Sequence, residues 1–181
     1  AGTGVWTASG AIADVNTLLT ALTFTPTLNF NGNFTIATSV SDGVAAPVNA
    51  IKVFTGTAVN DAPALDNTGA MTLTTITEDQ TTNSGNTVAS IISSAGGDRI
   101  TDVDASAVEG VAIEGLNSGY GKWQYSLDGG STWLDAGAVS NTSALLLRST
   151  DSIRFLPQFE NGSNPDFTFR AWDQTSGSAG T

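Results

Sequence analysis

The sequence predicts an all-β protein made of antiparallel strands. Thr, Ser, Ala, Gly, Asn and Val dominate it, and short alternations of apolar and small polar residues lie between turn residues. No stretch has the periodicity of a long helix. With 181 residues and 40% hydrophobic content, the chain can bury real cores. We therefore expect folded sheets rather than disorder.

One short helix is expected near the start of the chain, packed over a sheet. Between residues 10 and 24 apolar residues recur at spacings of three and four, namely Val15, Leu18, Leu19 and Leu22. Asp14 is placed to cap the first turn of this helix. Residues 34–42 and 50–59 then alternate apolar with small polar side chains, which predicts two neighbouring strands joined by a turn at 43–47.

A domain boundary is expected at the stretch VNDAP, residues 59–63, where the alternation stops at a polar pair followed by proline. The interpretation is a first module at 1–59, a link at 60–63 and a second module at 64–181. Candidate strands of the second module are 71–76, 87–92, 110–115, 121–127, 132–135, 144–148, 152–156 and 166–172. Turns every ten or so residues favour a β-sandwich of immunoglobulin type over a barrel.

The second core is expected to hold alternate residues of two strands. Trp123, Tyr125 and Leu127 share one face of their strand, as do Phe167, Phe169 and Ala171 of theirs. Neither module looks complete: the first has room for three or four strands, and the second ends at SGSAGT without the closing strand that the first shows at 50–59. An unpaired strand edge invites association.

The amino-acid composition excludes several kinds of binding and catalytic site. Six Lys and Arg stand against 17 Asp and Glu, so the net charge of −11 repels nucleic acid and attracts divalent cations. There is no Cys and no His, which removes thiol nucleophiles, imidazole bases and the usual zinc ligands. No apolar run is long enough to span a membrane, and the first residues are not a signal peptide, so we expect an internal piece of a larger protein.

Oxygen ligands remain, and they suit calcium, which needs six to eight of them. The candidates lie in the link and in turns of the second module: Asn60, Asp61, Glu78, Asp79, Asp102, Asp104 and Asp173, of which Asp79 is the weakest. In a sandwich, the link and the loops at the adjoining end lie together, so all but Glu78 and Asp79 are expected to meet. The alternatives are solvated acids in turns, or a carboxylate pair of a glycosidase, which is disfavoured because no acid has an evidently apolar surround.

The stretch SLDGGSTW, residues 126–133, matches the Asp-box pattern of sialidase-like propellers. It predicts a hairpin in which Asp128 satisfies turn amides, the glycines supply positive φ and Trp133 packs beneath. A propeller would repeat the motif in every blade, and it occurs once, so a structural hairpin is the preferred interpretation. Among the aromatic residues, Trp6 and Tyr120 are the least committed to a core and are candidates for contact with a sugar.

Together these stretches resemble the tandem immunoglobulin- or cadherin-like repeats of giant secreted bacterial adhesins of the repeats-in-toxin class. The resemblance is carried by GAIADVNTLLTALTFTPTLNFNGNFTIATSVSDG, VNDAP, TITEDQ, ITDVDAS, GKWQYSLDGGSTW, SIRFLP and FTFRAWDQTSGSAGT. It implies calcium at the joints between modules, with Asp61, Asp102, Asp104 and Asp173 as ligands. By the same resemblance, Glu78 serves this joint or the next one, and Asp42, in the position of Asp173, serves an upstream joint.

The resemblance implies a non-enzymatic, calcium-rigidified extender or split-domain segment of a large adhesin, located outside the cell or on the bacterial surface, with neighbouring repeats as partners. Without calcium, the crowded carboxylates would repel and the modules would swing independently. The alternative is a module that itself recognises a glycan or peptide on a host or surface. No catalytic residue, nucleic acid partner or membrane span is expected.

Overall fold

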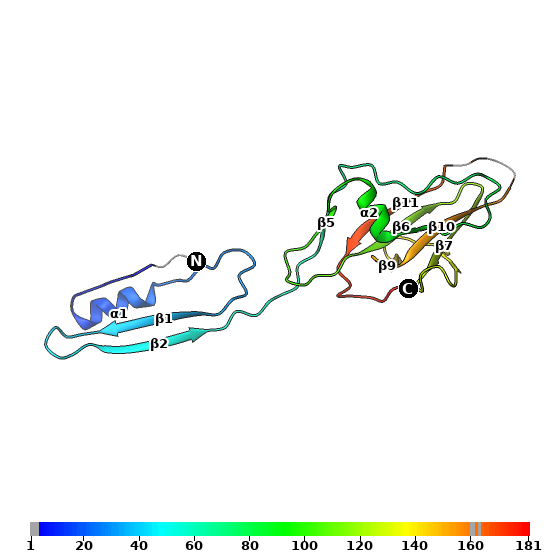
Figure 1. Ribbon diagram of the computed structural model, residues 1–181. Helices are drawn as coiled ribbons and strands as arrows, with labels where there is room; N and C mark the ends of the chain where they lie inside the picture. The colour runs from blue at the N-terminus through cyan, green and yellow to red at the C-terminus, as the bar shows by residue number, and fades with distance from the viewer. Residues whose placement is uncertain (1–3, 160–161, 163) are drawn as a thin grey trace. The chain divides into compact units, whose positions relative to one another are not determined.

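The computed structural model describes residues 4–159, 162 and 164–181, and within them the chain is all-β, with antiparallel sheets and two short helices (Figure 1). This confirms the predicted fold class. The chain divides into two compact units, Ala1–Val59 and Asn60–Thr181, each described by itself below. Neither helix of the described chain has the length and apolar content to cross a membrane.

The first unit contains one helix, α1 (Ile12–Thr20), and one hairpin of two strands, β1 (Phe34–Val40) and β2 (Val48–Phe54). The strands pair antiparallel from Phe34 opposite Phe54 to Val40 opposite Val48. The predicted hairpin is therefore present, although the second strand begins two residues earlier than expected and ends at Phe54. Stacked rings hold its open end: Phe34 lies 4.2 Å from Phe24 and 4.9 Å from Phe54, between ring centres.

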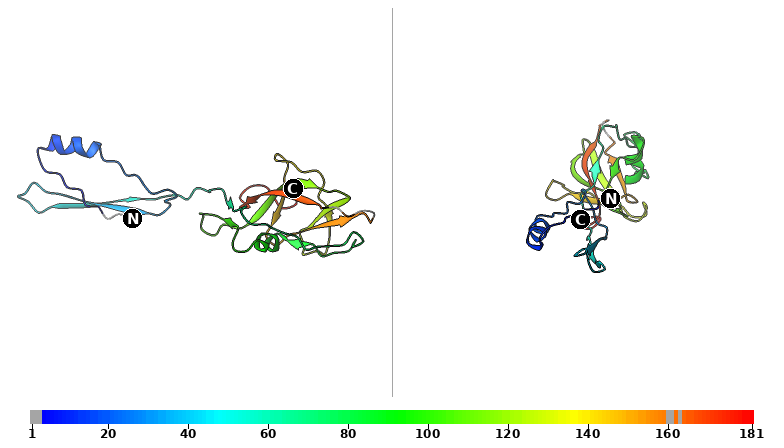
Figure 2. Two further views of the ribbon diagram at one scale, coloured as in Figure 1. Left: turned by 90° about the horizontal axis from the view of Figure 1, so that it is seen from above. Right: turned by 90° about the vertical axis from the view of Figure 1, so that its left-hand side faces the viewer.

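Two expectations about α1 were wrong. Asp14 is not its cap, since the N-cap residue is Ala11, which offers no side-chain acceptor; Asp14 lies inside the first turn, where a carboxylate favours the helix dipole. The helix also does not pack over the sheet, because none of its residues is buried and Leu18 and Leu19 remain about half exposed. Figure 2 shows α1 standing away from the hairpin.

The second unit is sandwich-like, with two main sheets. One sheet has the order β4 (Asn86–Thr87), β10 (Ser152–Pro157), β7 (Gly121–Ser126) and β8 (Leu134–Asp135). The other has the order β11 (Asp166–Trp172), β6 (Gly110–Asn117) and β9 (Leu145–Arg148). A third, minor pairing joins β3 (Ala64–Leu65) to β5 (Ile100–Thr101).

The core of this unit lies between the two main sheets, as the alternation of the strands predicted. Trp123 and Tyr125 are buried there, and Leu127, Phe167, Phe169 and Ala171 are partly buried against them. The ring of Trp123 meets those of Phe155 and Phe167 edge to face, each at 5.3 Å between ring centres. Ile113, Leu147 and Ile153 are fully enclosed.

Two predicted strands of the second unit were wrong. Residues 87–92 fall mostly in a helix, α2 (Val88–Ser94), because Thr87 caps it by accepting a hydrogen bond from the Ser90 amide. The carbonyl of Asp151 accepts a hydrogen bond from the Val88 amide, which satisfies another free donor of the first turn. Residues 71–76 form no sheet ladder. They are held instead by side chains, since Ser94 Oγ and Asn86 Oδ1 accept hydrogen bonds from the amides of Thr72 and Thr74.

Candidate functional site

The residues that lead into the second unit are hydrogen-bonded to two of its loops. The side-chain amide of Asn60 donates to Asp173 Oδ2 at 2.8 Å and, more weakly, to Thr175 Oγ1 at 3.4 Å. The backbone amide of Asp61 donates to Asp104 Oδ2 at 2.7 Å. The five residues expected to meet therefore form two hydrogen-bonded groups. Asn60 bonds to Asp173, while Asp104 bonds to both Asp61 and Asp102. The two groups are joined through the chain, because Asn60 and Asp61 are adjacent.

Asp173 follows directly after β11 and is only 9% exposed. Its Oδ1 accepts hydrogen bonds from the amide and the hydroxyl of Thr175, at 3.0 and 2.8 Å. These contacts favour the ionised form, so the pKa of Asp173 is lowered, with the Asn60 amide as the main cause and Thr175 next. The carboxylate is thus held charged and oriented by its own loop and by the link.

Asp102 and Asp104 follow β5, and the first of them orients the second. Asp102 Oδ1 accepts a hydrogen bond from the Asp104 amide at 2.8 Å. The other oxygen, Asp102 Oδ2, is shielded from solvent and has no hydrogen-bond partner within the described chain. A buried carboxylate oxygen without a donor is costly, and a bound cation would remove that cost.

The same loop lines a cavity of about 230 Å³ that contains two acids the sequence interpretation passed over, Asp98 and Glu109. The pKa of Glu109 is raised, chiefly by burial and secondarily by the charge of Asp98. The sequence does carry a signal for them, since four acids fall within residues 98–109. Asp98 precedes β5 and Glu109 precedes β6, so the sequence alone does not show that they line one cavity.

The donor chemistry here fits calcium, and the arrangement is incomplete. Carboxylate oxygens are the ligands that calcium prefers, and Asp102 Oδ2 is available. In the described ranges, however, no three acidic side chains are grouped closely enough to hold a metal ion. Asp104 and Asp173 already direct oxygens at protein donors. Asp102 and Asp104 are the candidate ligands that share this loop, and the remaining oxygens would have to come from the backbone or water.

Two further ligand candidates, Asp42 and Glu78, are held by turns of their own. Asp42 belongs to the first unit, where its Oδ1 accepts hydrogen bonds from the amides of Val44 and Ala45, both at 2.9 Å; the Ala45 bond is the main reason that its pKa is lowered. Glu78 is exposed in a turn closed by the Gln80 amide and the Thr77 carbonyl. Within the described ranges neither carboxylate has a hydrogen bond to another candidate, and their proposed roles at other joints stay predictions.

The SLDGGSTW stretch connects β7 to β8, which pair as a hairpin. Asp128 Oδ1 accepts hydrogen bonds from the Ser126 hydroxyl at 2.8 Å and the Thr132 amide at 2.9 Å, while Oδ2 accepts from the Thr132 hydroxyl at 2.7 Å. These bonds, with the Thr132 hydroxyl first, lower the pKa of Asp128 to about 2. Gly129 and Gly130 have φ of 71° and 90°, as the turn requires. All these contacts are internal, which favours a structural hairpin.

Trp133 is only partly buried; its ring lies next to Gly130 of the turn, where a Cβ would be 3.6 Å away, and it also packs against a cation. The guanidinium carbon of Arg154 lies 4.0 Å from its ring centre. Arg154 also donates to Gln124 Oε1 and to the Asn83 carbonyl, so it is held in place from three sides. Of the two uncommitted aromatic residues, Trp6 is 47% exposed and Tyr120 is 55% exposed, which leaves both free for contact.

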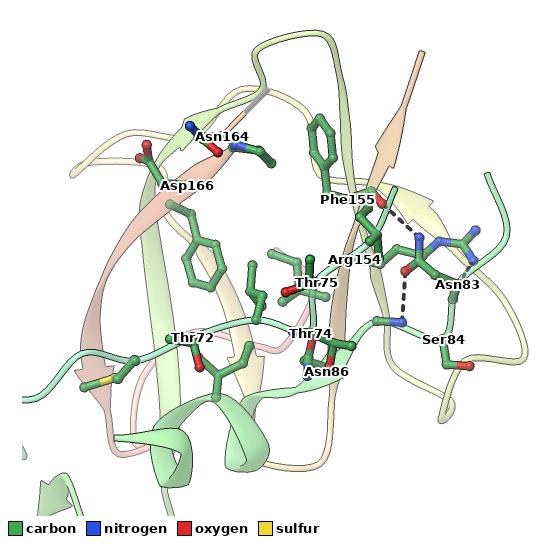
Figure 3. Close-up of a pocket in the computed structure, with 18 of the residues that line it drawn as sticks. Thr72, Thr74, Thr75, Asn83, Ser84, Asn86, Arg154, Phe155, Asn164 and Asp166 are labelled. Atoms are coloured by element: carbon green, nitrogen blue, oxygen red, sulfur yellow. Dashed lines mark hydrogen bonds between the residues drawn. The ribbon is translucent and has the colours of Figure 1, made fainter. Parts of the chain in front are cut away.

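A larger cleft lies elsewhere in the second unit, between β10, β11 and the segment 71–76 (Figure 3). Its volume is about 710 Å³, within the range of about 300–1,000 Å³ that is typical of ligand pockets. Apolar side chains such as Phe155 and Phe167 line it, and Thr72, Thr75, Asn83 and Asn164 bring polar groups to it. No sequence signal pointed to this cleft, because 71–76 was expected to pair in a sheet.

A scan of protein-family models, a search of curated proteins and a search of solved structures each found no match to this chain.

Proposed function

We propose that the chain is a calcium-stabilised structural segment, an extender or split-domain piece, of a large secreted bacterial surface adhesin of the kind its stretches resemble. The observation that carries the calcium part is the buried, unpartnered Asp102 Oδ2 next to Asp104, whose carboxylate already binds the Asp61 amide. A cation placed there would be held by the same loop that holds the link.

A bound calcium ion would supply positive charge that neutralises the carboxylates of Asp102 and Asp104. Asp102 and Asp104 would supply carboxylate oxygens as ligands. The Asp104 side chain also accepts a hydrogen bond from the backbone amide of Asp61 and so restrains the link. The Asn60 bond to Asp173 fixes the adjacent residue from a second loop. Hydrogen bonds from two neighbouring link residues to two loops restrain the start of the second unit, which supports a stiffening role for the ion.

The test is a melting curve of the 181-residue chain in excess calcium and in chelator, with small-angle scattering under both conditions. A site with a dissociation constant near about 10⁻⁴ M, at about 10 mM calcium, adds roughly 2.7 kcal/mol to the free energy of unfolding. The expected result is a higher midpoint and a stiffer particle in calcium, with magnesium giving a smaller effect. Identical curves in calcium and chelator would end the calcium proposal.

A second candidate is a module that binds a glycan or peptide, and the cleft of about 710 Å³ favours it. Its mixture of aromatic walls and amide or hydroxyl groups is typical of ligand sites. A glycan array or pull-down that shows saturable binding would support this candidate over a purely structural role. We propose no catalytic activity, and turnover of glycosides, esters or peptides would contradict that.

A further inference from the structure

Strand β11 lies at the end of its sheet, and one of its edges is open. It pairs with β6, which in turn pairs with β9, and no other described segment forms a ladder with it. The chain after β11 does not return along it. Instead, the Gly180 amide donates to the Leu146 carbonyl at 2.8 Å and the Leu146 amide to the Thr181 carbonyl at 3.3 Å, which places residues 180–181 beside β9. The row of backbone donors and acceptors along β11 is left exposed.

The large cleft lies beside this strand. Phe167 and Phe169 of β11 line it, together with Leu73 of the segment 71–76 and Phe155 of β10. Phe155 is labelled in Figure 3. The segment 71–76 contributes further free backbone groups. Its Thr72 and Thr74 amides are bonded to side chains, but within the described ranges the amides of Leu73 and Thr75 have no partner. The cleft thus combines an apolar interior with unpaired backbone, which is what an added β-strand requires.

The first unit contains a strand like β11 that has a partner. The run Phe34-Thr35-Ile36 in β1 matches Phe167-Thr168-Phe169 in β11. Each strand is followed by an aspartate, Asp42 or Asp173, that accepts the backbone amide two residues on. In the first unit this turn leads into β2, which pairs with all seven residues of β1. In the second unit the equivalent position beside β11 has no strand among the described residues.

Charge indicates which kind of strand fits. All but two of the 17 acidic residues and all but one of the six basic residues lie in the second unit, so that unit is strongly negative. The exceptions are Asp14, Asp42 and Lys52. The β2 strand alternates apolar residues, Ile51 and Val53, and its only charge is the cation of Lys52. Such a strand offers alternate apolar residues to the apolar lining of the cleft, and its cation suits the net negative charge of the unit.

We propose that the cleft between β11, β10 and residues 71–76 binds an extended peptide segment of the β2 type, with alternate apolar residues directed inward and a neutral or positive charge. The peptide pairs with the open edge of β11 and closes the sandwich by β-strand addition. This function goes beyond calcium binding and does not depend on it, since the cleft contains none of the link residues.

In the experiment, a synthetic peptide of residues 46–59 is titrated into the intact 181-residue chain. Isothermal calorimetry measures the binding, and hydrogen exchange shows which amides become protected. The expected result is saturable binding with a dissociation constant tighter than about 100 μM and slowed exchange of amides in β11. The matched control is the same peptide with Ile51→Asp and Val53→Asp, which keeps length and end groups and should bind at least about tenfold more weakly. Repeating the titration in chelator should leave the affinity unchanged, which separates this proposal from the calcium proposal.

A protein variant locates the site. Leu73→Asp places a carboxylate in the cleft and should abolish binding, and Phe169→Ala, a milder change, should weaken it; circular dichroism establishes that each variant is folded. Absence of peptide binding overturns the proposal, and so does protection confined to β9. Sedimentation of the chain alone at rising concentration provides the remaining check, because self-association that protects β11 would show that a second copy, and not a separate peptide, is the occupant.

Discussion

The side-chain amide of Asn60 donates a 2.8 Å hydrogen bond to Asp173 Oδ2, across 113 positions of sequence. Asn60 is exposed in the link, whereas Asp173 is nearly buried at the end of β11. The bond therefore ties the entry of the second unit to its last strand. Since the same pair is expected to gain from a nearby cation, its energetics can be tested with and without calcium.

Asn60→Ala should lower the free energy of unfolding by about 1 kcal/mol at pH 7 in chelator, the usual value of one such bond. The folded pKa of Asp173 is lowered from its ordinary 3.8, so the stability that the ionised group contributes is present above that value. It is lost as the pH falls through the folded pKa. Urea unfolding at pH 7 and near pH 3 should therefore show the difference between wild type and variant shrinking at low pH. A difference that grows on acidification would contradict this assignment.

Asp102→Asn should have opposite effects in the two conditions. In chelator the substitution removes a charge from a buried oxygen without a donor, so the melting midpoint should stay equal or rise. In excess calcium it removes a ligand, so most of the calcium-dependent rise in midpoint should disappear. Asp79→Asn, the same change at an exposed side chain, is the matched control and should leave the calcium effect intact. Equal calcium effects in both variants would place the ion elsewhere.

The strands were predictable from sequence where apolar alternation and burial coincide, as at Trp123 and Tyr125 in β7. Helix α2 was missed because its three apolar residues Val88, Ile91 and Ile92 are β-branched, which favours strands. The informative signal is their spacing of three and four behind a threonine cap. The segment 71–76 alternates as a strand does, and Met71, Leu73 and Ile76 pack on the core. However, no neighbouring strand among the described residues pairs with it. Alternation in the sequence does not show whether a pairing partner exists.

The part of the candidate site that depends only on the topology of a sandwich was predictable from the sequence. A link and the loops at the adjoining end of a sandwich lie together, and the bonds from Asn60 and Asp61 to Asp173 and Asp104 agree with that rule. Asp98 and Glu109 were not predictable in this way. Their sharing of a cavity with Asp102 depends on how the loop between β5 and β6 folds back, including a positive φ of 68° at Ser106.

Gly110→Ala should destabilise the second unit by about 1–3 kcal/mol, the usual cost of overpacking. A Cβ at this position of β6 would lie 2.7 Å from the buried ring of Trp172 and 2.8 Å from the Leu147 carbonyl, and neither can move freely. Gly4→Ala, which meets nothing within 4 Å, is the control and should be close to neutral. Thermal unfolding of both variants provides the measurement, and an unchanged midpoint for Gly110→Ala would mean that β6 and Trp172 can separate at little cost.

The Asp128 carboxyl should titrate with a pKa of about 2 in the folded chain, as measured by carboxyl carbon shifts in NMR. Three internal hydrogen bonds hold the ionised form, so the hairpin gains stability above the ordinary value of 3.8 and loses it as the pH falls toward 2. Thr132→Ala removes the hydroxyl bond, the largest cause, and should move the pKa back upward. An unshifted value in the wild-type chain would mean that the turn does not hold this carboxylate in solution.

The two units should differ sharply in stability when separated. No described residue of the first unit is buried, and its apolar side chains Ile12, Leu28 and Val44 are more than 80% exposed, whereas the second unit encloses a full core. Burial of apolar area is the main favourable term in folding, so a 60–181 fragment should melt cooperatively at the midpoint of the whole chain. A 1–59 fragment should exchange its amides rapidly, including those between β1 and β2, because an isolated two-stranded hairpin is marginal in water. Hydrogen exchange of both fragments and of the intact chain decides the matter: slow exchange in isolated 1–59 would show that the phenylalanine stack around Phe34 is sufficient by itself.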